Sequence, residues 1–293
     1  IDKYNRIIIY HGITVSHSVK KSEDFLPWQK KEDFARLKEW GFNLVRYFIL
    51  WEAIEPSSGQ YDERYMQKTI ERLQWLDELG IDVLLCIHQD LFSQRYGGGG
   101  FPPWAVDDDG FPFTPVSPHY KNYFTKPVMA CFDNFWRSEV LKNSYIDMVK
   151  YVLSRVDRQP NLIGLEIFDN PWPHIGPGFE QTILTEFYQR VEKMKLANNF
   201  QTPLYFQPML IVSVVIPTGL QFQPEDLAVY AVRYFDPFFE NENSTYGRTS
   251  HWLMSTTISQ RVRETRRWGL PMVVTDFSIG PNIAESLKFL GDW

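Results

Sequence analysis

The sequence predicts an α/β protein of the TIM (β/α)8 barrel class, and three observations lead to this prediction. Short apolar runs alternate with amphipathic helical stretches along almost the whole chain. The apolar runs are nearly continuous, as is typical of parallel strands that are buried on both faces. No Gly-x-Gly-x-x-Gly turn follows the first run, which favours a barrel over an open dinucleotide-binding sheet.

The predicted elements follow one another as βα units. Strands are expected over residues 6–13, 43–51, 82–90, 161–170, 203–210, 227–235 and 271–278. Helices are expected over residues 30–41, 63–79, 138–157, 179–199 and 256–269. An eighth strand is not evident, because only NIAESLKFLGDW remains after the seventh. We therefore expect a single barrel domain over residues 1–293 that is truncated at its C-terminus.

Composition narrows the class of protein. The chain has 293 residues, of which 44% are hydrophobic and 23% charged, as in globular proteins. A net charge of −6 argues against a nucleic-acid partner, and the arginines at 261, 263, 266 and 267 are predicted to form the solvated face of a helix. No apolar run of about 18 residues predicts a transmembrane segment. Secreted and cytoplasmic placement both stay open.

Candidate site residues lie where the predicted strands end, since TIM barrels carry function at that edge. The polar and aromatic residues at or just beyond these ends are Arg46, Trp51, His88, Asp90, Asp169, Asn170, Trp172, Arg233, Tyr234 and Asp276. Five strands that all end in polar or ionisable groups favour a functional site over a set of unrelated surface residues.

Metal and cofactor sites are not predicted. His88 and Asp90 share a strand face, but no second histidine stands near them with ligand spacing. Cys86 and Cys131 also lack such spacing and are expected to be packing residues. The YGGGGF stretch lacks the Lys and Ser/Thr of a phosphate loop, and its glycines are predicted to let a loop lie close to a ligand or another loop. We expect no metal and no cofactor.

Two longer segments make the prediction specific. GFNLVRYFILWEAIEPSSGQYDERY and VLLCIHQDLFSQRYGGGGFPPWA resemble glycoside hydrolase family 5 and, within it, the endoglycoceramidase-like branch. The resemblance runs from about residue 12 to residue 280. It implies a retaining β-glycosidase ancestry and a β-glycoside, glycan or glycolipid as substrate or ligand.

The family's two working carboxylates are glutamates in an Asn-Glu-Pro motif and in a Thr-Glu-Phe-like motif. Carried onto this chain, the acid/base position falls on Asn170, the residue before it on Asp169, and the nucleophile position on Asp276. Further altered positions are Cys86, Gln207 and Arg233. The positions that fit the family as they stand are Arg46, His88, Trp104 and Tyr234.

These departures bear on the chemistry. An amide at Asn170 cannot donate the proton that a poor leaving group needs, and Asp276 is one methylene shorter than the usual nucleophile. Strand alternation places Asp169 on the opposite face from Asn170, unless a bulge re-aims it as a substitute acid. Arg46 and Arg233 are both expected to favour an ionised Asp276.

Two functions remain open from the sequence. One is a working glycosidase with rearranged carboxylates. The other is an impaired or inactive relative that binds glycans or glycolipids, or regulates another protein. Trp51, Trp104, Trp172 and Tyr234 are predicted to stack on sugar rings in either case.

Overall fold

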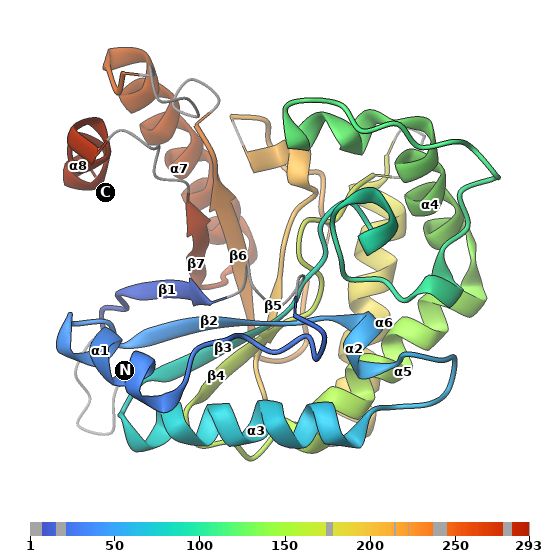
Figure 1. Cartoon of the computed structure of the whole chain (residues 1–293). Helices are drawn as coiled ribbons and strands as arrows, with labels where there is room; N and C mark the ends of the chain where they lie inside the picture. Colours follow the sequence, from blue (N-terminus) through green and yellow to red (C-terminus); the bar gives the residue numbers. More distant parts are fainter. Residues whose placement is uncertain are drawn as a thin grey trace. The chain divides into compact units, whose positions relative to one another are not determined.

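The computed structural model describes residues 8–15, 22–173, 178–213, 215–221, 223–236, 245–277 and 283–292. Strands and helices alternate along the chain (Figure 1). The strands are β1 (Gly12–Val15), β2 (Leu44–Ile49), β3 (Asp82–Ile87), β4 (Leu162–Glu166), β5 (Leu204–Phe206), β6 (Ala228–Tyr234) and β7 (Met272–Phe277). The helices are α1 (Lys31–Glu39), α2 (Trp51–Ile54), α3 (Glu63–Glu78), α4 (Lys126–Arg137), α5 (Glu139–Val156), α6 (Thr185–Ala197), α7 (Arg248–Trp268) and α8 (Ile283–Asp292).

The sheet has the strand order β1-β2-β3-β4-β5-β6-β7, the same as the order along the chain. Neighbouring strands run parallel, and Ile49 at the end of β2 lies opposite Ile87 at the end of β3. The residues that follow these two strands therefore emerge at the same edge. Seven parallel strands with intervening helices confirm the predicted TIM-barrel class.

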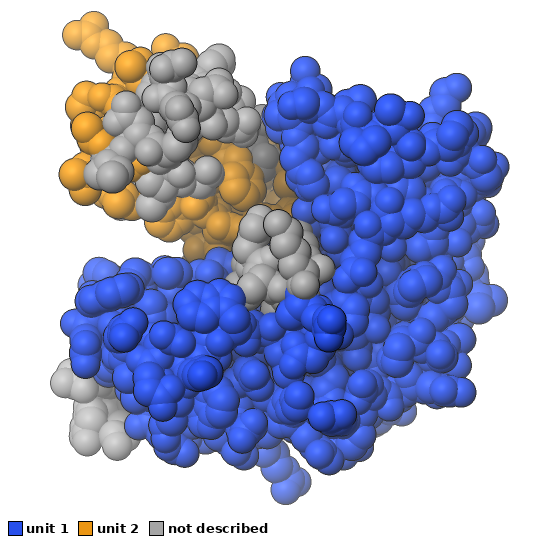
Figure 2. Space-filling view, in the orientation of Figure 1, with its two compact units in different colours: residues 1–169, 190–204 blue, residues 170–189, 205–293 orange. Residues whose placement is uncertain are grey.

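The chain divides into two compact units, coloured separately in Figure 2. Unit 1 comprises residues 1–169 and 190–204, and unit 2 comprises residues 170–189 and 205–293. The predicted single domain over residues 1–293 stays a prediction.

Unit 1 has an aromatic core between its helices and strands. Trp51 packs edge-on against Phe101, Phe135 and Tyr145, with ring centroids 5.2, 6.5 and 5.0 Å away. Helix α3 begins at its N-cap Asp62, whose side chain accepts a hydrogen bond from the Tyr65 amide at 2.9 Å. The buried face of α3 consists of Tyr65, Met66, Thr69, Leu73 and Leu76, at the spacing of one helix face.

Unit 2 has a smaller core around β6 and α7. Its buried cluster is formed by Tyr234, Tyr246, Leu253, Met254 and Phe289. Figure 1 shows α7 alongside β6 and β7.

One arginine of the predicted solvated cluster is buried. Arg261 is 1% exposed, and its guanidinium forms an ion pair of 2.7 Å with Glu264 on the same helix. It also donates to the carbonyl of Ile216. The prediction is wrong for this residue, because a carboxylate three positions along the helix lets the charge be buried as a pair, while Arg263, Arg266 and Arg267 are exposed.

The first strand begins later than predicted, and the reason is local. The side chain of Asn43 bonds to the backbone of the preceding segment, accepting from the His11 amide at 2.7 Å and donating to the Ile9 carbonyl at 2.8 Å. The Asn43 amide also donates to the His11 carbonyl at 3.1 Å, and the regular pairing of β1 with β2 begins at Gly12.

Candidate active site

In unit 1, Arg46 on β2 is the centre of a buried polar cluster. Its Nε donates to Glu166 at 2.7 Å, and its Nη2 donates to Asp169 at 2.8 Å and to the Cys86 sulfur at 3.2 Å. Glu166 and Asp169 are fully buried, and Arg46 is 3% exposed. Arg46 thus bonds to two carboxylates at and just after the end of β4, and its predicted effect on Asp276 stays a prediction.

His88 completes this cluster. Its Nδ1 lies 2.5 Å from the second carboxylate oxygen of Asp169, and its ring stacks on Phe48 with centroids 3.9 Å apart. The Arg46 guanidinium also lies over the Phe48 ring, 4.7 Å from its centroid. Both oxygens of Asp169 are therefore engaged, one by Arg46 and one by His88.

Asp169 reaches Arg46 because strand alternation stops before it. The last strand residue is Glu166, and the Asp169 amide then donates to the carbonyl of Ile87 at 3.1 Å. Asn170 follows with a φ of +52°, in the left-handed region. The period of two does not hold beyond Glu166, so Glu166 and Asp169 contact the same guanidinium.

Cys86, Glu166 and Asp169 also offer three possible metal-ligand atoms within 4.8 Å of one another. Arg46 donates to all three and takes the place that a cation would occupy. Burial raises the pKa of the Cys86 thiol, and Arg46 opposes this effect only in part. The raised pKa favours the thiol over the thiolate that a metal requires. The donor set therefore does not fit a metal centre.

In unit 2, Asn170 and Asp276, which the resemblance predicts to occupy the catalytic positions, share one arginine. Arg233 donates through Nη1 to the side-chain oxygen of Asn170 and through Nη2 to Asp276 at 2.5 Å. Asn170 is 8% exposed, while the Asp276 side chain is 23% exposed. Arg233 therefore contacts both the Asp276 carboxylate and the Asn170 amide, and its predicted effect on the ionisation of Asp276 stays a prediction.

Gln207 fixes the backbone at this point. Its side-chain oxygen accepts from the Asn170 amide at 3.0 Å, and the Tyr188 hydroxyl donates to its carbonyl at 2.8 Å. Gln207 thus supports the left-handed turn at Asn170. A cavity of about 10 Å³ lined by Gln207, Val232 and Arg233 has room for about one water molecule.

The predicted sugar-stacking residues of unit 1 lie in packed surroundings. Trp51 is 1% exposed and donates from Nε1 to the Glu55 carboxylate at 2.7 Å, while Trp104 donates to the Glu55 carbonyl at 3.0 Å. Burial raises the pKa of Glu55, with the Trp51 bond opposing it. The two tryptophans are held together, with ring centroids 5.2 Å apart.

Asp90 belongs to a separate group near the glycine-rich stretch. Its carboxylate lies 3.0 Å from Nε2 of His119 and accepts from the Tyr123 hydroxyl at 3.2 Å. The Asp90 and Gly99 backbones also pair as an antiparallel bridge. The glycines therefore allow the close loop packing that the sequence predicts.

Tyr234 and Trp172 are both buried in unit 2. Tyr234 is fully buried and stacks on Phe289 with centroids 6.2 Å apart, and burial raises the pKa of its hydroxyl. The cluster around Tyr234 includes Leu253 and Met254 of α7 and Phe289 of α8, so Tyr234 packs in the core of unit 2. Trp172 is 5% exposed.

Glu166 and Glu180 are buried acids that site prediction from sequence did not include. Glu180 accepts from the Met209 amide at 2.8 Å, the Gly219 amide at 2.5 Å and the Thr218 hydroxyl at 3.0 Å. Glu166 carried a usable signal, because a carboxylate within a buried strand needs a partner. Glu180 lies in an ordinary helical pattern, which gave no signal that its side chain is buried.

Comparison with known proteins places these residues in context. The family model described as Cellulase (glycosyl hydrolase family 5) matches residues 10–150. Endoglycoceramidase I of Rhodococcus hoagii (strain 103S) is 28% identical over an alignment of 234 residues that covers 75% of this chain and 46% of that protein. A glucosylceramidase of Aspergillus fumigatus is 43% identical over 79 residues, covering 27% of this chain and 10% of the relative.

Solved structures agree with these sequence relatives. Endo-glycoceramidase II from Rhodococcus sp., in a complex with ganglioside GM3, superposes with a TM-score of 0.85 at 26% identity, covering 93% of this chain and 67% of that one. The chain spans about half the length of the curated endoglycoceramidase I that it matches. Within the described residues, no helix combines the length and apolar character needed to cross a membrane.

Proposed function

We propose that this chain, whose residues 10–150 match the model of glycoside hydrolase family 5, binds β-glycosides of the glycolipid class and hydrolyses only those whose leaving group departs without a proton. The glycolipid class rests on the named relatives, which include endoglycoceramidases and a glucosylceramidase.

One observation carries the restriction on hydrolysis, namely the Arg233 guanidinium that bonds to both Asn170 and Asp276. Retaining hydrolysis uses two carboxyl groups about 5–5.5 Å apart, of which one protonates the leaving oxygen. Here the acid position is an amide, and the neighbouring guanidinium stays protonated throughout the working pH range. Neither group can supply the proton.

Asp276 can still act as a nucleophile. Its carboxylate would attack the anomeric carbon, the bond from that carbon to the aglycone oxygen would break, and the aglycone would leave as an anion. Water would then hydrolyse the glycosyl ester and regenerate the carboxylate. The Arg233 bond lowers the nucleophilicity of Asp276, because an ion pair stabilises the carboxylate before the attack.

A substitute acid at Asp169 has less support. Both of its oxygens are engaged, by Arg46 at 2.8 Å and by His88 at 2.5 Å, and the residue is fully buried. A general acid must reach the leaving oxygen within hydrogen-bond distance. Asp169 would have to break two contacts to do so.

A second candidate function is a glycan- or glycolipid-binding protein without hydrolysis. The Arg233–Asp276 ion pair favours it, since a carboxylate held by an arginine suits binding more than turnover. The two candidates differ in whether Asp276 forms the glycosyl ester.

The test compares aryl β-glucosides with a good and a poor leaving group, for the wild-type chain and for Asp276→Asn and Asn170→Glu. Asp147→Asn serves as the control, because Asp147 is exposed on α5. We expect cleavage of the good substrate alone, loss of that cleavage in Asp276→Asn, and a gain of about 10²- to 10⁴-fold on the poor substrate in Asn170→Glu.

Equal cleavage of both substrates by the wild-type chain would show that another residue donates the proton. No cleavage by any variant, with glucoside binding retained, would favour the binding protein over the enzyme.

A further inference from the structure

One segment of unit 1, residues 111–126, presents large apolar and aromatic side chains to solvent. These side chains are Phe111, Val116, Tyr120 and Phe124. Tyr120 is 50% exposed and Phe124 is 59% exposed. Exposed apolar patches that polar groups surround mark interaction sites on soluble proteins. This segment is therefore a candidate interaction surface.

The side chain of Asn122 holds the segment in an ordered conformation. Its oxygen accepts from the Val116 amide at 2.9 Å, and its nitrogen donates to the carbonyls of Val116 and His119 at 2.9 and 2.7 Å. The carboxylate of Asp90, just beyond β3, lies 3.0 Å from Nε2 of His119 and attaches the segment to the edge where β3 ends. Because the backbone is already ordered, little backbone entropy is lost when the segment binds a surface.

The charge of the segment differs from that of the whole chain. Residues 110–132 contain no aspartate or glutamate, although the chain carries a net charge of −6. Lys121 and Lys126 are both exposed. The nearest acid before the segment, Asp109, accepts from the side chain of Asn134 on α4 at 3.0 Å. The exposed apolar surface thus carries positive charge on a negatively charged protein.

Each of the two lysines lies beside an exposed aromatic ring. Residues His119–Phe124 form a 3-10 helix, in which side chains three positions apart lie in one row, so Lys121 is next to Phe124. The Lys126 ammonium lies 5.8 Å from the centroid of the Phe111 ring. Ammonium groups and rings therefore alternate over the same surface.

This combination fits a lipid surface better than a protein partner. Protein interfaces are depleted of lysine relative to the rest of the surface. Segments that lie on a membrane instead combine apolar and aromatic side chains, which enter the headgroup region, with lysines that anionic headgroups attract. The apolar side chains and the charge of the segment thus point to the same partner.

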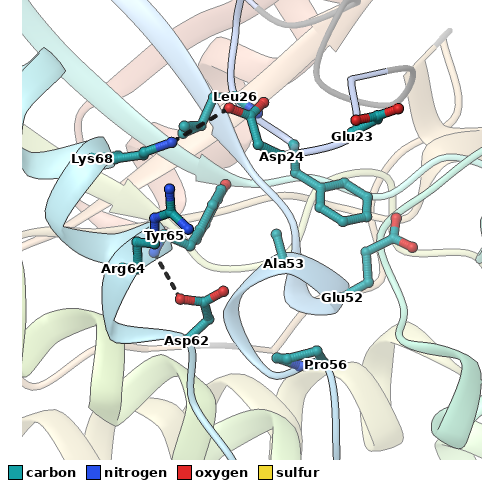
Figure 3. A pocket seen from close by; sticks show the side chains of 11 residues that line it. Glu23, Asp24, Leu26, Glu52, Ala53, Pro56, Asp62, Arg64, Tyr65 and Lys68 are labelled. Atoms are coloured by element: carbon teal, nitrogen blue, oxygen red, sulfur yellow. Dashed lines mark hydrogen bonds and ion pairs between the residues drawn. The ribbon is translucent and has the colours of Figure 1, made fainter.

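The pocket in Figure 3 shows the opposite balance of charge. Its lining includes the acids Glu23, Asp24, Glu52 and Asp62 beside Arg64 and Lys68. Lys68 pairs with Asp24 at 3.7 Å, as the dashed line marks. An anionic surface attracts lysines and repels an excess of carboxylates. Residues 111–126, and not this pocket, are therefore the part of unit 1 expected to face such a surface.

We propose that residues 111–126 dock unit 1 on an anionic lipid bilayer. The rings of Tyr120 and Phe124 enter the headgroup region, and Lys121 and Lys126 lie against anionic headgroups. Docking needs no glycan ligand, so the proposal goes beyond the proposed function and is tested separately from it.

The test is cosedimentation of the whole chain with vesicles that contain no glycolipid. The vesicles consist of phosphatidylcholine alone or of phosphatidylcholine mixed with phosphatidylserine. The variants are Phe124→Ser, which removes an exposed ring, and the double change Lys121→Gln with Lys126→Gln, which removes both ammonium groups.

Each variant has a matched control in unit 1 outside the segment. Trp40→Ser is the aromatic control, since Trp40 is 70% exposed at the end of α1. The charge control is Lys150→Gln with Lys193→Gln, at exposed positions of α5 and α6.

We expect the wild-type chain to bind the mixed vesicles more tightly than phosphatidylcholine alone, and this binding to weaken as salt rises. The double lysine change should weaken binding by about 25-fold, at about fivefold for each lysine, and Phe124→Ser by about fivefold. The control variants should bind as the wild type does. Thermal unfolding checks that each variant folds, and the double lysine variant decides the matter if Phe124→Ser does not fold.

Equal binding to the two kinds of vesicle, or binding to neither, would overturn the proposal. So would binding that both segment variants keep, or a loss that the control variants share. Sedimentation of the chain without vesicles tests a second copy as the partner, since self-association that Phe124→Ser abolishes would assign this surface to a protein contact instead. Hydrolysis of the aryl β-glucosides is measured without vesicles, so none of these outcomes decides the proposed function.

Discussion

Arg233 and Asp276 are paired residues in the parallel register of β6 and β7, and their side chains form an ion pair of 2.5 Å. This pairing depends on an irregularity in the sheet. Val232 lies opposite Val274, but Arg233 lies opposite Asp276, so Thr275 is skipped. Without this shift Arg233 would pair with Thr275, and Asp276 would point to the other face. The bulge therefore aims the nucleophile position at the arginine.

A double-mutant cycle should detect this pair. We expect Arg233→Met and Asp276→Asn to be non-additive in the free energy of unfolding, with a coupling of about 0.5–3 kcal/mol. Urea denaturation of the wild type, both single variants and the double variant measures it. Arg266→Met, at an exposed position of α7, should show no coupling to Asp276→Asn. Strict additivity of Arg233→Met and Asp276→Asn would contradict an ion pair between these side chains.

The buried ion pair between Arg46 and Asp169 should contribute far more to the free energy of unfolding than a surface ion pair does. Asp169→Asn leaves the charge of Arg46, which is 3% exposed, without one of its carboxylates, and we expect a loss of about 3–5 kcal/mol in unfolding free energy. The matched surface change is Glu78→Gln, whose ion pair with Lys31 is half exposed and should contribute at most about 1 kcal/mol. Similar losses in the two variants would argue against a buried charge cluster.

The sequence predicted the alternation of strands and helices because apolar periodicity is a local property. It also predicted Arg46, His88 and Asp169 as candidate site residues, since TIM barrels carry function at the strand ends. The sequence did not predict which groups these three side chains contact. The predicted alternation of side chains ran past Glu166, where the strand ends, so it did not predict that Glu166 and Asp169 contact the same guanidinium. The direction of the Asp276 side chain depends on a bulge between β6 and β7, and the residue types of β7 do not predict that bulge.

The aromatic residues show the same limit. Trp51 and Tyr234 follow or end strands, as sugar-stacking residues do, yet both side chains are almost fully buried. Burial depends on which helices cover that part of the sheet, and for Tyr234 these are α7 and α8. The sequence alone does not distinguish an aromatic side chain that stacks on a sugar from one that is buried in the core under a helix. Their binding role stays a prediction.

Glu180 should make the stability of unit 2 depend on pH. Burial raises its pKa, and the bonds from Gly219, Met209 and Thr218 oppose this only in part. A carboxyl whose pKa is raised by folding stabilises the folded state fully below its unfolded pKa, and this contribution is lost as pH rises through the folded pKa. We expect the unfolding free energy of wild type minus Glu180→Gln to fall as pH rises through and above the ordinary glutamate range. A difference that is flat with pH, measured by denaturation at several pH values, would contradict this.

Gly100 should tolerate a side chain less well than Gly110 does. Both have positive φ, +133° and +73°, so alanine is strained at each position. At Gly110 an added Cβ meets nothing within 4 Å, and we expect a loss of about 1 kcal/mol. At Gly100 it would lie 2.7 Å from the Gln89 Cβ and 2.9 Å from the His88 carbonyl, so the backbone must move.

That movement would also weaken the bond between the Gly100 amide and Glu52. Overpacking of this kind typically adds about 1–3 kcal/mol, so Gly100→Ala should lose more unfolding free energy than Gly110→Ala by roughly that amount. Urea denaturation of the two variants gives the comparison. Equal stability losses would mean that the glycine-rich stretch can shift away from β3 without breaking its contact with Glu52.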